Sequence, residues 1–246
     1  MRVRNPAEYG YPTTDVASLS AKALEVTRRL TDLYGELPFS SKDPMSMLVD
    51  IILSHRTRDE QTAAAWENLL KRFGAWEVVR DAPTSEVQET IANVNFPEVK
   101  APRLQKIMRE ITEERGNLNL DFLCELPLAE AAAWLNRFDG VGPKTTACVL
   151  LFSCRMPTLP VDVHVHRVSG RLGLIGKKVT AEAAHTLLQA LLPQDSRSIY
   201  NFHKALLRHG QRICVFEHPR CNKCALTDLC DYYNTVVKPP SQQRPV

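Results

Sequence analysis

The chain has 246 residues, 44% of them hydrophobic, and its 31 basic and 28 acidic residues leave a net charge of +3. This length can bury one large core or two modest ones, and so small a net charge neither requires nor excludes nucleic acid as a partner. No apolar stretch is long enough to cross a bilayer, which argues against a membrane-spanning protein. The N-terminal residues 1–12 lack the apolar region of a signal peptide, so we expect a cytoplasmic protein.

Helical periodicity dominates the sequence and strand alternation is nearly absent. An apolar stripe from Leu19 to Leu33 predicts the first helix, and the almost wholly apolar segment Met45–Leu53 predicts a helix buried between others. Thr57 and Glu60 are spaced as a capping box that opens a helix ending at Gly74. Further helices are predicted near 84–93, 100–115, 127–138, 143–154, 163–173, 180–192 and 196–209. The tail 238–246 is expected to be disordered.

The segment FDGVGPKTTACVLLF, residues 138–152, predicts two helices joined by a tight turn. Gly140, Val141 and Gly142 form the turn, and Pro143 suits the first position of the second helix, where no amide donor is needed. The amides of the turn and of the helix N-terminus point outward and suit a phosphate. An ordinary helix–helix corner is the alternative, but the Pro-Lys-Thr sequence after the turn favours a phosphate-binding helix–hairpin–helix.

Two residues in and after this hairpin are candidates for catalysis. Lys144 lies in the first turn of the second helix, whose positive end disfavours the ammonium form, so it is a candidate nucleophile. The alternative is a simple electrostatic contact. Asp162 lies 18 residues further on, at the start of a helix predicted by the apolar stripe of 161–172. It either caps that helix, or stabilises positive charge and accepts a proton from the amine.

Four cysteines near the C-terminus have the spacing C-x6-C-x2-C-x5-C: Cys214, Cys221, Cys224 and Cys230. Four thiolates from so short a segment can enclose one metal centre, and such a centre can fold a segment that has no core of its own. Zinc usually takes two C-x2-C pairs, and this run has one, so the spacing favours an iron–sulfur cluster without excluding zinc. Disulfides are the alternative, but the seven cysteines are odd in number and no secretory segment is present.

Positive charge is concentrated in residues 197–223, which carry six basic side chains against Glu217 alone, a local charge of +5. The basic residues are Arg197, Lys204, Arg208, Arg212, Arg220 and Lys223. Such an excess is either a solvated face or a surface for nucleic acid.

Taken together, GVGPKT at 140–145, PVDVHVHRV at 160–168 and the four-cysteine run resemble the endonuclease III family of DNA repair glycosylases. The resemblance covers the chain from about Pro44 to Cys230. It implies an all-α fold of two domains, a helical barrel with the hairpin at 43–157 and a discontinuous domain formed by 1–42 and 158–246. It also implies a [4Fe–4S] cluster on the four cysteines. The implied partner is double-stranded DNA with a damaged base or an abasic site. The resemblance also implies that the protein is a monomer, that it binds no membrane and that, in a bacterium, it is associated with the nucleoid.

The resemblance implies that Lys144 attacks C1′ of a flipped-out nucleotide with the help of Asp162, expels an oxidised pyrimidine and cuts the strand 3′ to the site by β-elimination. Arg56 takes the position usually held by glutamine in the loop that fills the hole left by the base, and Phe96 matches the intercalating wedge. The full set of implied DNA contacts is Arg56, Phe96, Gly140, Val141, Gly142, Thr145, Arg212, Arg220 and Lys223.

The sequence also departs from the family pattern. Arg56 adds a charge on the orphan-base side that could favour guanine, Val163 stands where threonine is usual, and the segment between Lys100 and the hairpin is longer than usual. These departures indicate a divergent branch. Two other functions stay open. One is a mismatch-type or mainly AP-lyase member of the superfamily. Lys144 argues against the mismatch type, because mismatch and adenine glycosylases generally lack a lysine at this position. The other is a non-catalytic DNA-binding module with a structural metal, which the pairing of Lys144 with Asp162 disfavours.

Overall fold

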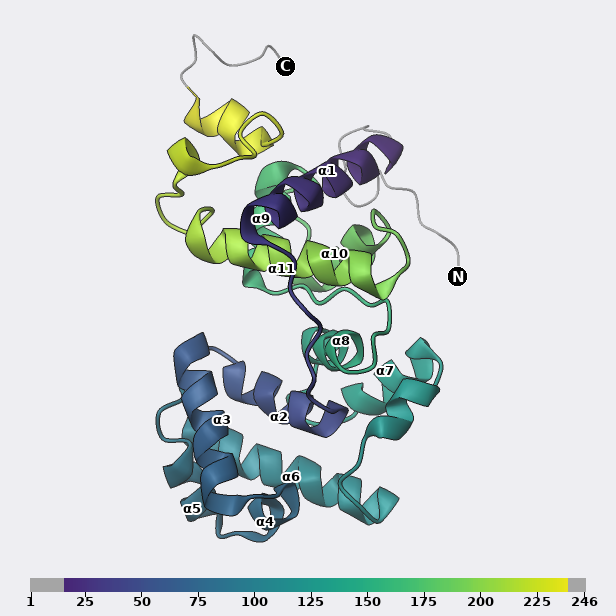
Figure 1. The fold of residues 1–246 in the computed structure, drawn as a ribbon, viewed down its shortest axis with the longest axis vertical. Coiled ribbons are helices and arrows are strands. Elements are labelled where there is room, and N and C mark those ends of the chain that lie inside the picture. Colours follow the sequence, from purple (N-terminus) through teal and green to yellow (C-terminus); the bar gives the residue numbers. More distant parts are fainter. Residues whose placement is uncertain (1–15, 239–246) are drawn as a thin grey trace. The chain divides into compact units, whose positions relative to one another are not determined.

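The computed structural model describes residues 16–238, and this part of the chain is helical without any strand (Figure 1). The chain divides into two compact units, one of residues 40–156 and the other of residues 1–39 and 157–246. No helix in the described part is long and apolar enough to span a membrane. The expected lack of a signal peptide and almost all of the expected disordered tail concern residues outside the described part. The domain boundaries expected from the family resemblance stay a prediction.

The unit of residues 40–156 is built around α2 (Pro44–Ser54). Asp43 caps this helix by accepting a hydrogen bond from the Ser46 amide, and Pro44 occupies its first position. Since α2 is apolar on nearly every side, it is buried among α3, α6 and α8. The other elements of the unit are α3 (Asp59–Phe73), α4 (Trp76–Asp81), α5 (Thr84–Thr90), α6 (Pro97–Arg115), the 3-10 turn η2 (Asp121–Glu125), α7 (Leu128–Asn136) and α8 (Pro143–Phe152).

In the other unit, α11 packs against α1 and α9 and provides a strongly amphipathic helix at its centre (Figure 1). Ile199, Phe202 and Leu206 of α11 are fully buried. The elements are α1 (Val16–Tyr34), α9 (Val163–Leu172), α10 (Ala181–Gln189), α11 (Ser196–Arg212), the 3-10 turn η3 (Cys221–Lys223) and a π-helical turn η4 (Tyr233–Val237). The apolar face of α11 is therefore the core of this unit.

Most of the predicted helices are confirmed, and the errors are helix ends and one short helix. The predicted capping box is wrong, because Arg58 is the N-cap of α3 and the Thr57 hydroxyl is bound elsewhere. Helix α6 starts three residues before the predicted position 100, since Pro97 takes its first position. Leu33 is 54% exposed although it belongs to the predicted stripe. Helix α4 was not predicted, because six residues carry too little periodicity.

A disulfide joins Cys124 of η2 to Cys154, just after α8. The bond closes a segment that contains α7, the hairpin turn and α8. It therefore ties the C-terminal end of α8, the helix that carries Lys144, to η2. Sequence reasoning missed this bond because the two cysteines are separated by 30 residues and no local spacing pairs them.

Candidate functional site

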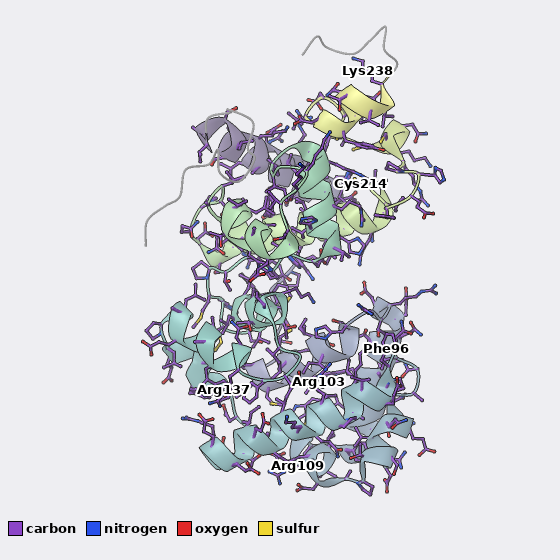
Figure 2. The ribbon with its side chains drawn as sticks, turned by 180° about the vertical axis from the view of Figure 1, so that it is seen from behind. Phe96, Arg103, Arg109, Arg137, Cys214 and Lys238 are labelled. Atoms are coloured by element: carbon purple, nitrogen blue, oxygen red, sulfur yellow. A yellow bond between two sulfur atoms is a disulfide. The ribbon has the colours of Figure 1, made fainter. Side chains whose placement is uncertain are left out.

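The predicted hairpin is present, with α7 and α8 joined by a turn in which each residue has its own backbone role. Gly140 has a φ of +76°, a conformation that favours glycine, and the Arg103 side chain packs against it where a Cβ would lie. The Val141 side chain is buried, and its amide donates to the Phe138 carbonyl at 3.0 Å. Gly142 is exposed and extended at the N-cap of α8. Figure 2 labels Arg103, whose helix α6 supports the turn.

The first turn of α8 is fixed on two sides while Lys144 is half-buried between them. The Thr145 hydroxyl is buried and lies 3.0 Å from Nε2 of His55, in the loop after α2. The Thr146 hydroxyl donates to the side-chain carbonyl of Asn136, at the end of α7, at 2.7 Å. Lys144 is therefore held in position by the bonds of its neighbours rather than by its own amine.

His55 is a component of this site that sequence reasoning missed. Burial lowers the pKa of its imidazole to about 4, and the positive charges of Lys144, Lys100 and Arg103 act in the same direction. The imidazole is consequently neutral at pH 7 and adds no charge beside Lys144. A motif search could not have found it, because its role depends on the burial and the three cations that folding brings around it.

We expect the unit of residues 40–156 to lose stability as the pH falls from 6.5 to 4 because of His55. The histidine has a pKa near 6.5 in the unfolded chain and about 4 in the fold, so only the unfolded state takes up the proton in this window. After discounting for solvent screening, the loss is about 1.5 kcal/mol. The chain has three tryptophans, all in this unit: Trp66, Trp76 and Trp134. Their fluorescence during urea unfolding at several pH values measures the loss.

In this experiment His55→Gln should remove most of the dependence on pH. His185→Gln is the matched control, since burial also lowers the pKa of His185 but this residue belongs to the other unit. If wild type and His55→Gln lose the same stability between pH 6.5 and 4, His55 is not the responsible group.

The structure brings Arg56 and Phe96 into one connected surface of the same unit. The side-chain amide of Asn95 donates to the Arg56 carbonyl, and the Asn95 backbone amide donates to Thr57 Oγ1 at 3.2 Å. Arg56 is exposed, and the Phe96 side chain is 48% exposed. Figure 2 shows Phe96 at the N-terminal end of α6. Both residues were predicted as DNA contacts. Although they are 40 positions apart in the sequence, they lie on loops that are hydrogen-bonded to each other.

Asp162 lies at the start of α9, as predicted, and caps it. Its Oδ1 accepts hydrogen bonds from the amides of His164 at 2.9 Å and Val165 at 2.7 Å. The side chain is half-buried, and the neighbouring Val163 is 72% exposed. Both capping bonds use Oδ1, so the second carboxylate oxygen is not part of the cap.

The four motif cysteines line one pocket in the unit that contains α9 and α11. Within residues 16–238, no three His, Cys, Asp or Glu side chains lie close enough to hold a single metal ion. Burial raises the pKa of Cys224 to about 11 and also raises those of Cys221 and Cys230.

Side chains from outside the motif hold this cysteine segment in place, and the sequence did not indicate them. Arg171 of α9 donates to the Val215 carbonyl at 2.7 Å and to the Phe216 carbonyl at 2.8 Å. Arg167, one turn earlier, donates to the Cys214 carbonyl at 3.0 Å. From α1, Arg29 pairs with Asp228 at 2.8 Å. The segment is therefore anchored to two helices that are distant in sequence.

The basic residues of 197–223 divide into two groups in the structure. Arg197 and Arg208, on α11, serve the fold: Arg197 donates to the Leu37 carbonyl, and Arg208 donates to the Tyr34 carbonyl at 2.8 Å. The second group, beside the cysteines, is exposed and consists of Arg212, Arg220 and Lys223. This second group is the one available to phosphates.

Comparison with known proteins places this chain in one family. The model of the HhH-GPD superfamily base excision DNA repair proteins matches residues 49–194. Endonuclease III of Thermotoga maritima is 34% identical over 211 residues, which cover 86% of this chain and 91% of that protein. Endonuclease III of Haemophilus influenzae is 27% identical, with 87% and 97% covered.

Solved structures of DNA glycosylases share the fold. The structure of a trapped endonuclease III–DNA covalent intermediate matches with a TM-score of 0.75 at 20% identity, covering 89% of this chain and 99% of that one. A thermostable thymine-DNA glycosylase matches with a TM-score of 0.69 at 22% identity, covering 89% of this chain and 96% of that one. With its helix–hairpin–helix, its lysine on α8 and its match to the superfamily over more than half its length, the chain belongs to the endonuclease III-like HhH-GPD family and is a DNA glycosylase/AP lyase.

Proposed function

We propose that this enzyme removes oxidised pyrimidines from double-stranded DNA and then cuts the strand 3′ to the abasic site by β-elimination, acting as a monomer. The observation that carries the proposal is the position of Lys144, half-buried in the first turn of α8 directly after the hairpin turn. A glycosylase that used water as its nucleophile would not need an amine there.

In this mechanism Lys144 Nζ attacks C1′ of the flipped nucleotide. The new C1′–N bond replaces the N-glycosidic bond, the base leaves with its bonding electrons, and the proton that the amine loses passes to the base. The C1′–O4′ bond then breaks, O4′ takes up a proton from water, and the opened sugar is a protonated Schiff base. The iminium acidifies the C2′ proton; its loss expels the 3′ phosphate as the C3′–O bond breaks. Water then hydrolyses the imine and releases the amine of Lys144.

Asp162 is the carboxylate proposed to assist base expulsion. Its Oδ1 is held by two amides of α9, which leaves Oδ2 for the reaction. A negative charge fixed in this way stabilises the positive charge that develops on the sugar as the base leaves. It is also a suitable acceptor for the proton that the lysine loses on attack.

The proposed DNA contacts form three groups. In the hairpin turn, Gly140 and Gly142 are exposed and present backbone amides to a phosphate, while the buried Val141 and Thr145 hold the turn in place. Arg56 and Phe96 act at the site of the extruded base, one toward the orphan base and the other between base steps. The exposed cations beside the cysteines, Arg212, Arg220 and Lys223, contact phosphates.

We also propose that Cys214, Cys221, Cys224 and Cys230 hold a [4Fe–4S] cluster. Such a cluster takes one thiolate at each iron, whereas a zinc ion needs all its ligands within about 2.3 Å of one point. The four cysteines line one pocket, and their spacing contains one C-x2-C pair rather than the two that are usual for zinc, which supports the cluster. When bound, it crosslinks residues 214–230 and so stabilises the segment.

We expect about four irons per chain and broad visible absorbance in protein purified anaerobically. Cys224→Ser should remove the cluster and unfold the segment of residues 214–230, which shows as faster amide hydrogen exchange in that segment. The tryptophan fluorescence should persist, since all tryptophans lie in residues 40–156. Cys148→Ala, at a buried cysteine outside the motif, is the control and should keep its iron. One zinc and no iron per chain, from cells grown with ample iron, contradicts the assignment.

Borohydride trapping tests the proposed reaction. The enzyme is incubated with duplexes that carry thymine glycol, a mismatched thymine or a bare abasic site, and borohydride reduces any Schiff base to a stable protein–DNA adduct. Adducts on both thymine glycol and abasic DNA are expected. An adduct on abasic DNA alone indicates a mainly AP-lyase enzyme, and excision of mismatched thymine without an adduct indicates the mismatch type.

A further inference from the structure

We infer that Lys100 is a positioning residue for base extrusion, which holds Arg56 and Phe96 in the conformations that they need on DNA. This inference rests on the proposed function, because it takes these two side chains as the ones that occupy the extrusion site. Lys100 touches no substrate and lies below the surface that the two side chains form.

Lys100 is a buried lysine whose donors are all used. Its side chain comes from the first turn of α6, and the residue is only 3% exposed. The ammonium donates to the Leu53 carbonyl at 2.7 Å, the His55 carbonyl at 2.8 Å and the Thr57 hydroxyl at 2.8 Å. An ammonium has three protons, and all three bind the segment 53–57. Burial of such a group is unfavourable without this complement of acceptors, so the loop and the lysine stabilise each other.

The segment that Lys100 binds contains an unfavourable backbone conformation. Arg56 has a φ of 53°, in the left-handed region that residues with a side chain seldom occupy. Lys100 binds the residue before Arg56 through its carbonyl and the residue after it through its hydroxyl. It therefore restrains both sides of the unfavourable residue, and such conformations persist only where the surroundings over-determine them.

The same lysine binds the second residue with a positive φ at this surface. Phe96 has a φ of 60° and is the N-cap of α6, and its carbonyl accepts from the Lys100 backbone amide at 3.0 Å. Thr57 Oγ1 accepts from the Asn95 amide as well as from Lys100, which joins the two loops directly. One residue thus binds Phe96 through its backbone and both neighbours of Arg56 through its side chain.

This connection has a consequence for DNA binding. A wedge and a residue that fills the vacated space must both be in place while the base is out of the stack. If the two loops are rigid and coupled, less conformational freedom is lost on binding, and affinity for DNA with an extruded nucleotide increases. Without the ammonium, Arg56 loses the restraint on both of its neighbours, and the loop that carries it must be ordered when DNA binds.

The first test uses the free enzyme and measures amide hydrogen exchange. Lys100→Met keeps the length of the side chain and removes its three donors, and Thr57→Val is a milder variant that removes the shared hydroxyl. Both should raise exchange in 54–58 and 94–100 by about tenfold while α8 stays protected. Lys106→Met removes an exposed lysine of the same helix and should change nothing. Unchanged exchange in both loops in Lys100→Met overturns the inference.

The second test measures binding to a duplex with a stable tetrahydrofuran abasic analogue by fluorescence anisotropy. Lys100→Met should weaken binding about tenfold in the wild-type background and have no effect in Arg56→Ala/Phe96→Ala. An equal loss in both backgrounds shows a general structural defect and overturns the inference. Because the analogue cannot form a Schiff base, this result is independent of the borohydride experiment, which alone decides the proposed chemistry.

Discussion

Lys144→Gln is expected to abolish the borohydride-trapped adduct and strand cleavage on abasic DNA. A glutamine amide has no nucleophilic lone pair, so neither C1′ attack nor Schiff-base formation can take place. The fold should be retained, because the first turn of α8 is anchored by Thr145 to His55 and by Thr146 to Asn136. Gel separation of the adduct measures the covalent chemistry. Anisotropy on the tetrahydrofuran duplex measures DNA binding separately.

The control for this prediction is a lysine elsewhere on the surface. Lys106→Gln changes an exposed side chain of α6, paired with Glu110 at 3.7 Å, and should leave the adduct at its wild-type level. An adduct that still forms at the normal rate in Lys144→Gln identifies another amine as the nucleophile. The proposed mechanism is then wrong even if binding to DNA is unchanged.

Asp162→Asn is expected to reduce base excision by a factor of about 10² or more. Asparagine keeps an oxygen that can accept from the His164 and Val165 amides, since both capping bonds use Oδ1 alone. The start of α9 and the affinity for abasic DNA should therefore persist. What is lost is the negative charge that stabilises the sugar as the base departs. Single-turnover excision of thymine glycol measures this loss.

The same variant should affect the lyase step less than excision, because an abasic site has no base to expel. The ratio of the two rates on matched duplexes is therefore the decisive readout. Asp162→Ala serves as the contrast: it removes the cap as well as the charge, so it should also lower the melting temperature. If Asp162→Asn slows excision and cleavage of abasic DNA equally, the carboxylate acts in a step common to both.

Several parts of the site could be predicted because their chemistry depends on residues that are close in sequence. The hairpin follows from glycines and a proline at fixed offsets, the N-cap of α9 from an Asp before an apolar stripe, and the cysteine segment from its spacing. Local backbone geometry decides each of them, so the printed order of residues is enough. Helix ends were less well predicted, as at Thr57, whose hydroxyl is bound by Lys100 and Asn95 rather than by its own helix.

By itself, then, the sequence determined the family and the helical class, and it predicted that Lys144 begins one helix, that Asp162 begins another and that the four cysteines lie in one segment. The tertiary structure decided what surrounds them. Lys100 binds carbonyls 45 and 47 positions earlier in the chain, and His55 acquires its low pKa only when folding buries it beside three cations. Arg171 supports a loop more than 40 residues away. Such roles arise from desolvation and from contacts between distant segments, which no local pattern of residues encodes.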